Sequence, residues 1–260
     1  DSSDTDFYIY YGNSDASDYA IDDTYGAENV WDSDFALVYH FNESSGTIYD
    51  STSNDNDASS SGPTYEYTGQ IGYALDFEAS NGDYINASHS TSLDITSELT
   101  IETWVNPESY SYDRGTICTK QGTYFTNFPT SGKASVYTYG PGDSGSSYMD
   151  SSTTFSTGSW QHLTWTEDTS GHRIIYYNGS SDNSGDYEAG IDSDNSPLYI
   201  GRYNPTHSRR LDAKLDELRI SDKARASQWV STTYNNQNSP STFYSIGSEE
   251  AATRSAIYTS

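Results

Sequence analysis

The chain has 260 residues, and 38 Asp and Glu against 12 Lys and Arg give it a formal net charge of −26. Such an acidic surface repels phosphate backbones and anionic lipid headgroups, so we expect no nucleic acid and no membrane surface among its partners. No apolar run approaches the roughly 18 residues of a membrane span, so no membrane insertion is expected of this segment. The single cysteine, Cys118, excludes an internal disulfide and a Cys-rich zinc site.

The residue composition predicts a folded domain. Aromatic residues make up 15% of the chain, with 25 Tyr, whereas disordered acidic chains are poor in aromatics. A surface with many acidic groups and few lysines is typical of proteins that stay hydrated where salt screens charge. The composition favours a halophilic or marine source, and the alternative is an acidic extracellular domain without salt adaptation.

Strand-like runs alternate with clusters of turn residues along most of the chain. We predict strands at residues 7–11, 36–41, 73–77, 99–105, 116–120, 134–139, 161–166, 173–177, 198–201 and 214–220. We predict turns at residues 51–61, 79–83, 140–147, 178–185 and 192–197. The best helical pattern, at 222–234 after a candidate N-cap at Ser221, is short. Many short strands without a βαβ rhythm predict an all-β fold, a two-sheet antiparallel β-sandwich.

Composition also divides the chain. Residues 1–35 are rich in Asp and Tyr, and we interpret them as the end of a preceding β unit or a connector. Residues 36–247 form the predicted sandwich domain, and the polar residues 248–260 are predicted to be a flexible tail or linker.

Several motifs follow one another between Val38 and Ile220. They are LVYHFNESSGTIYDSTSNDNDA, GQIGYALDFEASNGDYINASHSTSLDI, LTIETWVNPES, RGTICTKQG, GSWQHLTWTED, IIYYNG, PLYIGR and AKLDELRISDKA. In this order they resemble the laminin-G-like branch of the concanavalin A-like lectin and glucanase jelly rolls. The segment from Tyr8 to Glu43 is similar to the junction at which a small β domain precedes such a domain in prokaryotic, often archaeal, surface proteins. The resemblance implies a concanavalin A-like jelly roll within a larger exported surface or fibre protein.

Catalytic motifs are missing from the sequence. Glucanases of this fold carry Glu-x-Asp-x-x-Glu on one strand, and no Glu here is followed two places later by Asp. The five histidines are scattered, and no Gly-x-Ser-x-Gly elbow surrounds a serine. We therefore expect that the protein is not an enzyme.

Calcium is the cofactor that the sequence favours, in a structural role. Hard cations take six to eight oxygen ligands, and the loop from Asp50 to Asp57 offers four carboxylate and amide side chains, although it lacks the Gly of an EF-hand. The resemblance implies a calcium ion between the loop after the first strand and an Asp on the last strand. The corresponding residues are Asn42, Glu43, Gly46 and Asp216. The alternative is that the 50–57 segment is an ordinary solvated acidic turn.

Ligand contacts are expected from aromatic and polar residues in loops, because sugar rings stack on aromatic side chains. The predicted ligand-binding residues are Tyr112, Arg114, Tyr124, Tyr203 and Arg209, with Tyr110, Phe125 and Tyr148 as further candidates. The segment GRYNPTHSRR brings three arginines together. It is interpreted as an anion or acidic-glycan contact, a docking patch for an acidic subunit, or a set of local salt bridges.

Three sequons make Asn42, Asn86 and Asn178 candidate glycosylation sites. Asn178, in a predicted hairpin turn with Gly179, is expected to be the most accessible.

Two functions are compatible with these observations. The first is a non-catalytic extracellular recognition or adhesion module that binds a glycan or a surface protein at a cell or virion surface. The alternative is a structural subunit or decoration protein of a cell-surface filament or virion, which would self-assemble with neighbouring subunits. Tyr-rich surfaces suit both, because Tyr supplies contact area at low entropic cost.

Overall fold

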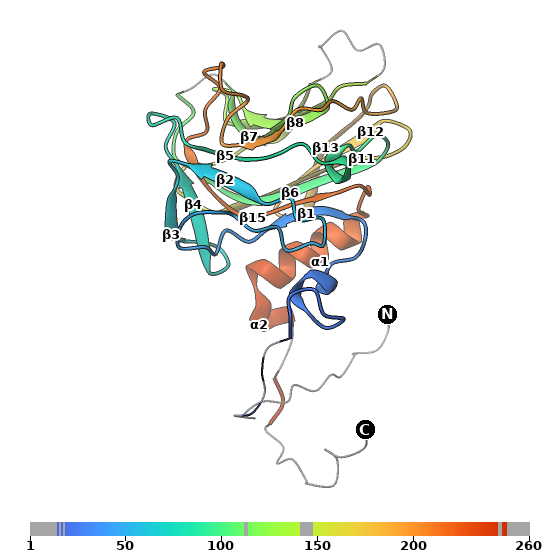
Figure 1. Ribbon diagram of the computed structural model, residues 1–260. Coiled ribbons are helices and arrows are strands. Elements are labelled where there is room, and N and C mark those ends of the chain that lie inside the picture. The colour runs from blue at the N-terminus through green and yellow to red at the C-terminus, as the bar shows by residue number, and fades with distance from the viewer. Residues whose placement is uncertain are drawn as a thin grey trace.

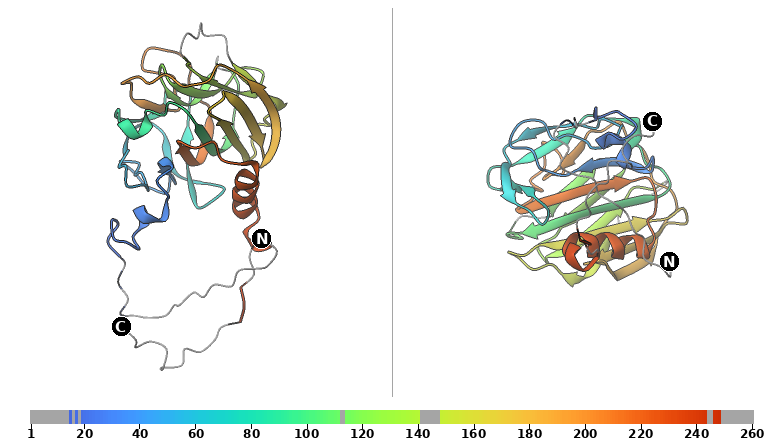
Figure 2. Two further views of the ribbon diagram at one scale, coloured as in Figure 1. Left: turned by 90° about the vertical axis from the view of Figure 1, so that its right-hand side faces the viewer. Right: turned by 90° about the horizontal axis from the view of Figure 1, so that it is seen from below.

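The computed structural model describes residues 15, 17, 19–111, 114–140, 148–243 and 246–248. Within these residues the strands form two antiparallel sheets that pack face to face (Figure 1). The predicted all-β sandwich, a concanavalin A-like jelly roll, is confirmed. The outer side of the first sheet carries the C-terminal helix, while the outer side of the second sheet lies on the far side of the molecule (Figures 1 and 2).

The first sheet, called sheet A, has the strand order β13-β12-β11-β6-β15-β4-β3, and β1 pairs with the remaining length of β15. Its strands are β1 (Phe35–Tyr39), β3 (Thr64–Thr68), β4 (Tyr73–Phe77), β6 (Leu99–Pro107), β11 (Gln161–Glu167), β12 (His172–Tyr177), β13 (Ser180–Asp186) and β15 (Ala213–Ser221).

The second sheet, called sheet B, has the strand order β10-β9-β8-β7-β14-β5-β2. Its strands are β2 (Ala58–Ser61), β5 (Tyr84–Ala87), β7 (Gly115–Lys120), β8 (Tyr124–Phe128), β9 (Lys133–Thr138), β10 (Met149–Thr154) and β14 (Leu198–Ile200). The helical elements are the 3-10 helices η1 (Ala27–Val30) and η2 (Thr91–Leu93) and the α-helices α1 (Ser227–Asn238) and α2 (Pro240–Phe243).

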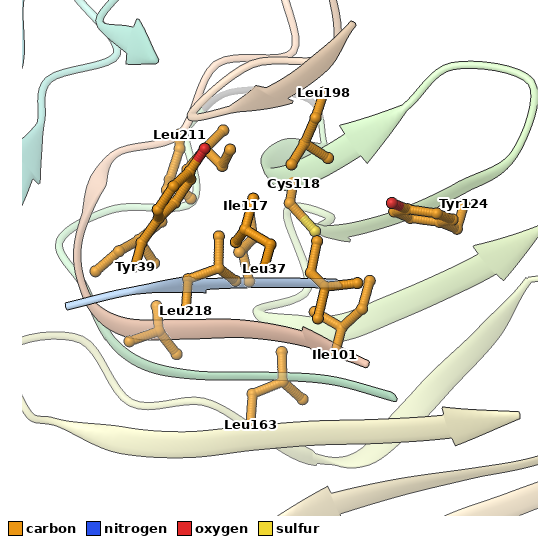
Figure 3. Packing of buried hydrophobic residues seen from close by; sticks show 14 of the residues in the cluster. Leu37, Tyr39, Ile101, Ile117, Cys118, Tyr124, Leu163, Leu198, Leu211 and Leu218 are labelled. Atoms are coloured by element: carbon orange, nitrogen blue, oxygen red, sulfur yellow. The ribbon is translucent and has the colours of Figure 1, made fainter. Parts of the chain in front are cut away.

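The core lies between the two sheets because alternate residues of each strand point inward. Leu37, Ile101 and Leu218 of sheet A meet Ile117 and Leu198 of sheet B, all fully or almost fully buried (Figure 3). Each such side chain stabilises the fold by roughly 1.5–3 kcal/mol relative to an exposed one. The core therefore fixes which face of each strand is left to point outward.

Trp165 and Trp104 lie on opposite sides of sheet A. Trp165 belongs to the core, and its indole N–H donates to Thr126 Oγ1 at 2.7 Å. Trp104 is also buried, but on the outer side of the sheet, where the ring of Tyr234 from α1 stacks on it at 5.6 Å. The helix closes this part of the sandwich from outside, so Trp104 is not an inter-sheet residue.

Helix α1 begins later than the sequence predicts. The amide of Asp222 donates to Asp34 O at 2.9 Å, and the amide of Arg225 donates to Thr100 Oγ1 at 2.9 Å. These bonds hold residues 222–225 against sheet A in a non-helical conformation, so the helix starts at Ser227 and Ser221 ends β15 instead of capping it.

The predicted turns at 51–61 and 178–185 are partly wrong, because β2 and β13 begin inside them. The predicted strand at 7–11 lies outside the described residues. The Asn178-Gly179 turn has the expected left-handed backbone, with φ values of 48° and 74°.

Candidate ligand-binding face

A row of side chains crosses the outer face of sheet B. Tyr199 of β14 pairs with Thr119 of β7, Thr119 pairs with Phe125 of β8, and Phe125 pairs with Tyr137 of β9. Directly paired residues of antiparallel strands project to the same side. The alternation that puts Tyr124 and Phe128 in the core therefore places an aromatic row on the outer surface.

Five aromatic residues gather on this row and form what we call the aromatic cluster: Phe125, Tyr137, Tyr139, Tyr148 and Tyr203. The Phe125 ring lies 5.1 Å from Tyr137, 5.5 Å from Tyr148 and 5.8 Å from Tyr203, between centroids. Tyr139 completes the group, because its hydroxyl lies 3.1 Å from that of Tyr203. Phe125 and Tyr137 are covered, whereas Tyr139 and Tyr148 are half-buried and present ring surface to solvent.

The loop that carries Tyr203 is held in shape by Asn204. The Asn204 Oδ1 atom accepts hydrogen bonds from the amides of Thr206 and His207, both at 3.0 Å. Asn side chains commonly stabilise tight turns in this way. The amide of Tyr203 donates to Arg209 O at 3.1 Å, which closes the loop and brings Tyr203 and Arg209 to the aromatic cluster together.

Arginine side chains border the cluster. The Arg114 guanidinium lies 4.4 Å from the Tyr148 ring centroid, and the Arg209 guanidinium lies 4.8 Å from that of Tyr203. Further along the same sheet, Arg202 lies 4.5 Å from the ring of Tyr84. Each contact is within the range of a cation–π interaction. We call the aromatic cluster with Arg114, Arg202 and Arg209 the aromatic–arginine face.

Three buried oxygens on this side of sheet B have no hydrogen-bond partner: Thr119 Oγ1, Asn127 Oδ1 and Ser135 Oγ. Asn127 and Ser135 are directly paired and lie two residues from Phe125 and Tyr137, so they share the outer face. An unsatisfied buried polar group costs about 1–3 kcal/mol. Because Thr119, Asn127 and Ser135 are buried, these atoms are not open to a molecule bound at the surface.

The structure brings together three of the predicted ligand residues, Arg114, Tyr203 and Arg209. Tyr124 is wrong as a ligand residue: it is fully buried, its hydroxyl donates to Leu93 O at 3.3 Å, and its ring lies in the core (Figure 3). Tyr112 lies outside the described residues. Tyr137 and Tyr139 were not predicted, because strand alternation marks an outward face but does not show which strands are neighbours.

Asp216 is the predicted calcium residue with the most unusual environment. Its carboxylate is fully buried on β15, and Oδ2 accepts the amide of Ile71 at 2.8 Å. The other oxygen, Oδ1, has no hydrogen-bond partner. Burial, with a smaller contribution from the Glu217 carboxylate, raises the pKa of Asp216 to about 7 against the lowering effect of the backbone amides that it accepts. An ionised Asp216 therefore needs a positive charge close by.

Asn42 approaches the same turn as Asp216. Asn42 Oδ1 accepts the amide of Tyr73 at 2.9 Å, and a Cβ at Gly72 would lie 2.6 Å from that oxygen. A Cβ at Gly69 would lie 2.6 Å from Asp216 Oδ2. The turn between Gly69 and Gly72 thus lies against both side chains, which is why both positions lack a side chain.

Glu43 and Gly46 have separate contacts. Glu43 Oε1 accepts the amide of Tyr49 at 2.9 Å, while Glu43 Oε2 is buried without a hydrogen-bond partner. The carbonyl of Gly46 accepts a hydrogen bond from the Tyr65 hydroxyl at 2.6 Å.

Asp50, also predicted as a metal ligand, is hydrogen-bonded by protein donors on both carboxylate oxygens. Its Oδ1 accepts the amides of Val38 and Thr52 at 3.0 Å each, and its Oδ2 accepts the Thr52 hydroxyl at 2.9 Å and the amide of Asn56 at 3.0 Å. Four donors satisfy the lone pairs of one carboxylate. Asp50 therefore organises its own loop, which is a structural role.

A different group of carboxylates comes together on sheet A. Among the described residues, Asp76, Glu78 and Glu108 form the one group of three whose oxygens lie within 4.8 Å of one another. Burial and the Glu108 carboxylate raise the pKa of Asp76 to about 6. The Lys214 ammonium bonds to Glu108 and lies 3.9 Å from Asp76, so the group is an ion-pair network around a lysine.

The three sequon asparagines differ in exposure. Asn42 is exposed, whereas Asn86 and Asn178 are half-buried. Asn178 Oδ1 accepts the amide of His162 at 2.8 Å, and Tyr234 of α1 lies against the neighbouring Gly179. The expectation that Asn178 is the most accessible of the three is wrong, because α1 packs over its hairpin.

A laminin G family model, described as the concanavalin A-like lectin/glucanases superfamily, matches residues 79–231. The chain belongs to this superfamily. No curated protein matches the sequence.

Solved structures share the fold at low sequence identity. The binding domain of Paraclostridial Mosquitocidal Protein 1 is 16% identical with a TM-score of 0.62, covering 78% of this chain and 52% of that one. The botulinum neurotoxin serotype G binding domain is 19% identical with a TM-score of 0.62, covering 79% and 51%. This chain therefore spans about half the length of those domains.

A third structure matches over nearly its whole length. Domain 4 of AbnA, a GH43 extracellular arabinanase from Geobacillus stearothermophilus solved with arabinotriose, is 21% identical with a TM-score of 0.58. The match covers 76% of this chain and 96% of that domain. Among the described residues of the present chain, no helix combines the length and apolar character needed to cross a membrane.

Proposed function

We propose that the chain is a non-catalytic glycan-binding module and that its ligand face is the aromatic–arginine face of sheet B. The observation that carries the proposal is the convergence of five aromatic rings from four strand and loop segments, bordered by Arg114 and Arg209. Sugar rings present C–H surfaces that pack on aromatic rings and hydroxyls that accept hydrogen bonds from guanidinium groups.

The relatives of known structure support a binding role. Two are binding domains of toxins, and the third was solved with a bound arabinose oligosaccharide. The face also lies away from α1 and from the ends of the described chain, so neither would obstruct a ligand (Figure 1).

Calcium fits the surroundings of Asp216, and we propose it as a structural ion. The proposal rests on two carboxylate oxygens, Asp216 Oδ1 and Glu43 Oε2. Both atoms are buried and have no hydrogen-bond partner. Asn42 would add an amide oxygen beside the same turn. A divalent cation would neutralise the buried carboxylate and tie β15 to the loop after β1.

We propose further that the module acts outside the cell as part of a larger surface protein. The acidic composition and the resemblance of its flanks to surface-protein junctions support this setting.

A second candidate function is contact with a neighbouring protein subunit. It is favoured by exposed apolar side chains before β1: Tyr19, Ile21, Tyr25 and Val30 are 58–75% exposed. Size-exclusion chromatography with light scattering tests it, because an ordered oligomer that Tyr25→Ser dissolves would indicate that this segment mediates assembly.

A glycan array followed by calorimetry tests the primary proposal. We expect Tyr148→Ala to weaken binding of any glycan hit by about tenfold or more, equivalent to about 1.4 kcal/mol. Tyr67→Ala is the matched control, because Tyr67 is a 42% exposed tyrosine on sheet A. Equal affinity of both variants and the unchanged protein would contradict the assignment of the face.

A further inference from the structure

We infer that the ligands of the aromatic–arginine face are acidic glycans, which bear a carboxylate or a sulfate group. The inference rests on the proposed function and names the chemical class of its ligand. It is carried by the arginines of the face, whose charges are not neutralised within the described part of the protein.

Arginines elsewhere in the described chain all have carboxylate partners. Arg173 pairs with Glu167 at 2.6 Å, Arg219 with Glu217 at 2.6 Å, and Arg225 with Asp32 at 3.0 Å. In a chain with 38 acidic residues against 12 basic ones, this is the expected state of an arginine.

The remaining arginines behave differently. Arg114, Arg202, Arg209 and Arg210 form no salt bridge with any described carboxylate, and all four lie in the segments that border the outer face of sheet B. The interpretation of GRYNPTHSRR as a set of local salt bridges is therefore wrong for the described residues. Among the described residues, the guanidinium groups without a carboxylate partner therefore lie on one side of the molecule.

Arg202 and Arg210 are placed directly opposite each other. They form an isolated antiparallel bridge at the base of the 203–209 loop. Like charges at directly opposed positions destabilise a pair of strands. Arg202 is only 8% exposed, and its one hydrogen bond among the described residues is from Nε to Asn204 O at 3.0 Å. Arg210 Nε is buried with no hydrogen-bond partner.

A nearby carboxylate does not neutralise this pair. Asp83 follows Gly82, against which Arg210 packs, and precedes Tyr84, on which Arg202 stacks. Its Oδ2 accepts the amide of Glu78 at 2.9 Å instead. Two arginines at opposed positions without an acidic partner are costly unless an anion neutralises them.

Stacking on aromatic rings leaves the N–H groups of these arginines available to bind oxyanions. A guanidinium that lies on an aromatic ring keeps its N–H edge free, and this planar edge matches a carboxylate or sulfate with two parallel hydrogen bonds. Arg114 on Tyr148 and Arg209 on Tyr203 have this arrangement, and their guanidinium groups make no hydrogen bond to another described residue. The rings that they stack on would hold the sugar to which the anionic group belongs.

The net charge of −26 narrows the ligand class further. Long polyanions such as nucleic acids meet repulsion from the whole surface, whereas a short acidic oligosaccharide meets only the local arginines. An acidic sugar with room for ring stacking therefore suits this face better than an extended polyphosphate.

Matched oligosaccharide pairs test the inference by calorimetry on the full chain. One pair is an oligogalacturonate and its methyl ester, and the other is a sulfated galactan oligosaccharide and its desulfated form. We expect at least one acidic member to bind about tenfold or more tightly than its neutral partner. The pair that shows the difference distinguishes carboxylate from sulfate recognition.

Variants of the two stacked arginines test whether these residues cause the preference for the acidic member of a pair. Arg209→Gln and Arg114→Gln are expected to remove the preference for the acidic member, because each variant should weaken binding of the acidic member about tenfold and binding of the neutral member by much less. Lys223→Gln is the control, because it removes the same charge from a 52% exposed lysine paired with Glu98 on another part of the molecule. Arg209→Lys separates charge from geometry, since lysine lacks the planar fork.

The possible results distinguish a preference for acidic glycans from glycan binding in general. Equal binding of acidic and neutral members overturns the inference and leaves the glycan-binding proposal standing. A preference that survives both arginine variants also overturns it. Failure of every acidic and neutral oligosaccharide to bind, together with an empty glycan array, overturns both.

Discussion

Tyr124 and Phe125 are neighbours in β8, yet their rings lie on opposite faces of sheet B. Tyr124 packs in the core between the sheets, and Phe125 forms the centre of the aromatic cluster on the outer face. One residue therefore contributes to the stability of the sandwich, and the next builds the surface proposed to bind a glycan.

Stability measurements should separate the two sides of sheet B. We predict that Tyr124→Ala lowers the free energy of unfolding by about 3–5 kcal/mol, as for other large core aromatics. Tyr148→Ala should cost less than about half as much, because Tyr148 is half-buried. Urea denaturation measures both, and equal losses would mean that the outer cluster is as essential to the fold as the core.

The contact of α1 with sheet A is predicted to depend on Tyr234. Its ring stacks on Trp104, whose indole N–H donates to Gln237 Oε1 at 2.6 Å. Tyr234→Ala should expose the indole and lower the free energy of unfolding by about 2–4 kcal/mol. Tryptophan fluorescence should shift to longer wavelength, whereas Tyr25→Ala, on a 75% exposed ring, should change neither quantity.

Acid should destabilise the protein through His162. Burial lowers the pKa of His162 from 6.5 to about 3, so the folded state holds it neutral while the unfolded state binds a proton. The free energy of unfolding is therefore unaffected by this histidine above pH 6.5 and decreases as the pH falls from 6.5 towards 3. The decrease amounts to about 2 kcal/mol at pH 5. Unfolding curves at pH 7 and pH 5 test this, and His162→Gln should reduce the difference between them by that amount.

Calcium should raise the melting temperature, and chelation should lower it. Asp216→Asn should abolish the calcium-dependent shift, because it removes the charge of the buried carboxylate that has an unpartnered oxygen. Asp50→Asn is the matched control: it should destabilise the loop through lost hydrogen bonds but retain the shift. An unchanged melt in excess chelator would remove the metal proposal.

The sequence predicts the interior strands better than the edges. All four edge strands of the two sheets, β2, β3, β10 and β13, are missing from the prediction, whereas among the interior strands only β5 and β8 are missing. Edge strands pack on fewer neighbours and face solvent, so polar sequences such as SSDNSGD of β13 are stable there without an apolar alternation. Serine and aspartate are also the residues of turns, and for this reason β2 and β13 were assigned to turns.

The sequence predicts only part of the candidate site, because strand pairing brings some of its residues together. Arg114, Tyr203 and Arg209 stand out as rare cations and loop aromatics, and the structure groups them. Tyr137 and Tyr139 join them only because β9 lies beside β8, a pairing that no local pattern encodes. Tyr124 and Phe125 are both predicted as loop residues, but they lie in β8, whose alternation turns Tyr124 into the core and Phe125 to the outer face.

Amide NMR titration with an acidic oligosaccharide that binds would show which surface of the protein holds the ligand. Chemical shifts are expected to change in β7, β8 and β9 and around residues 202–210, and those of α1 and sheet A are expected to stay unchanged. Changes confined to α1, to sheet A or to residues 19–30 would contradict the assignment of the aromatic–arginine face as the ligand site.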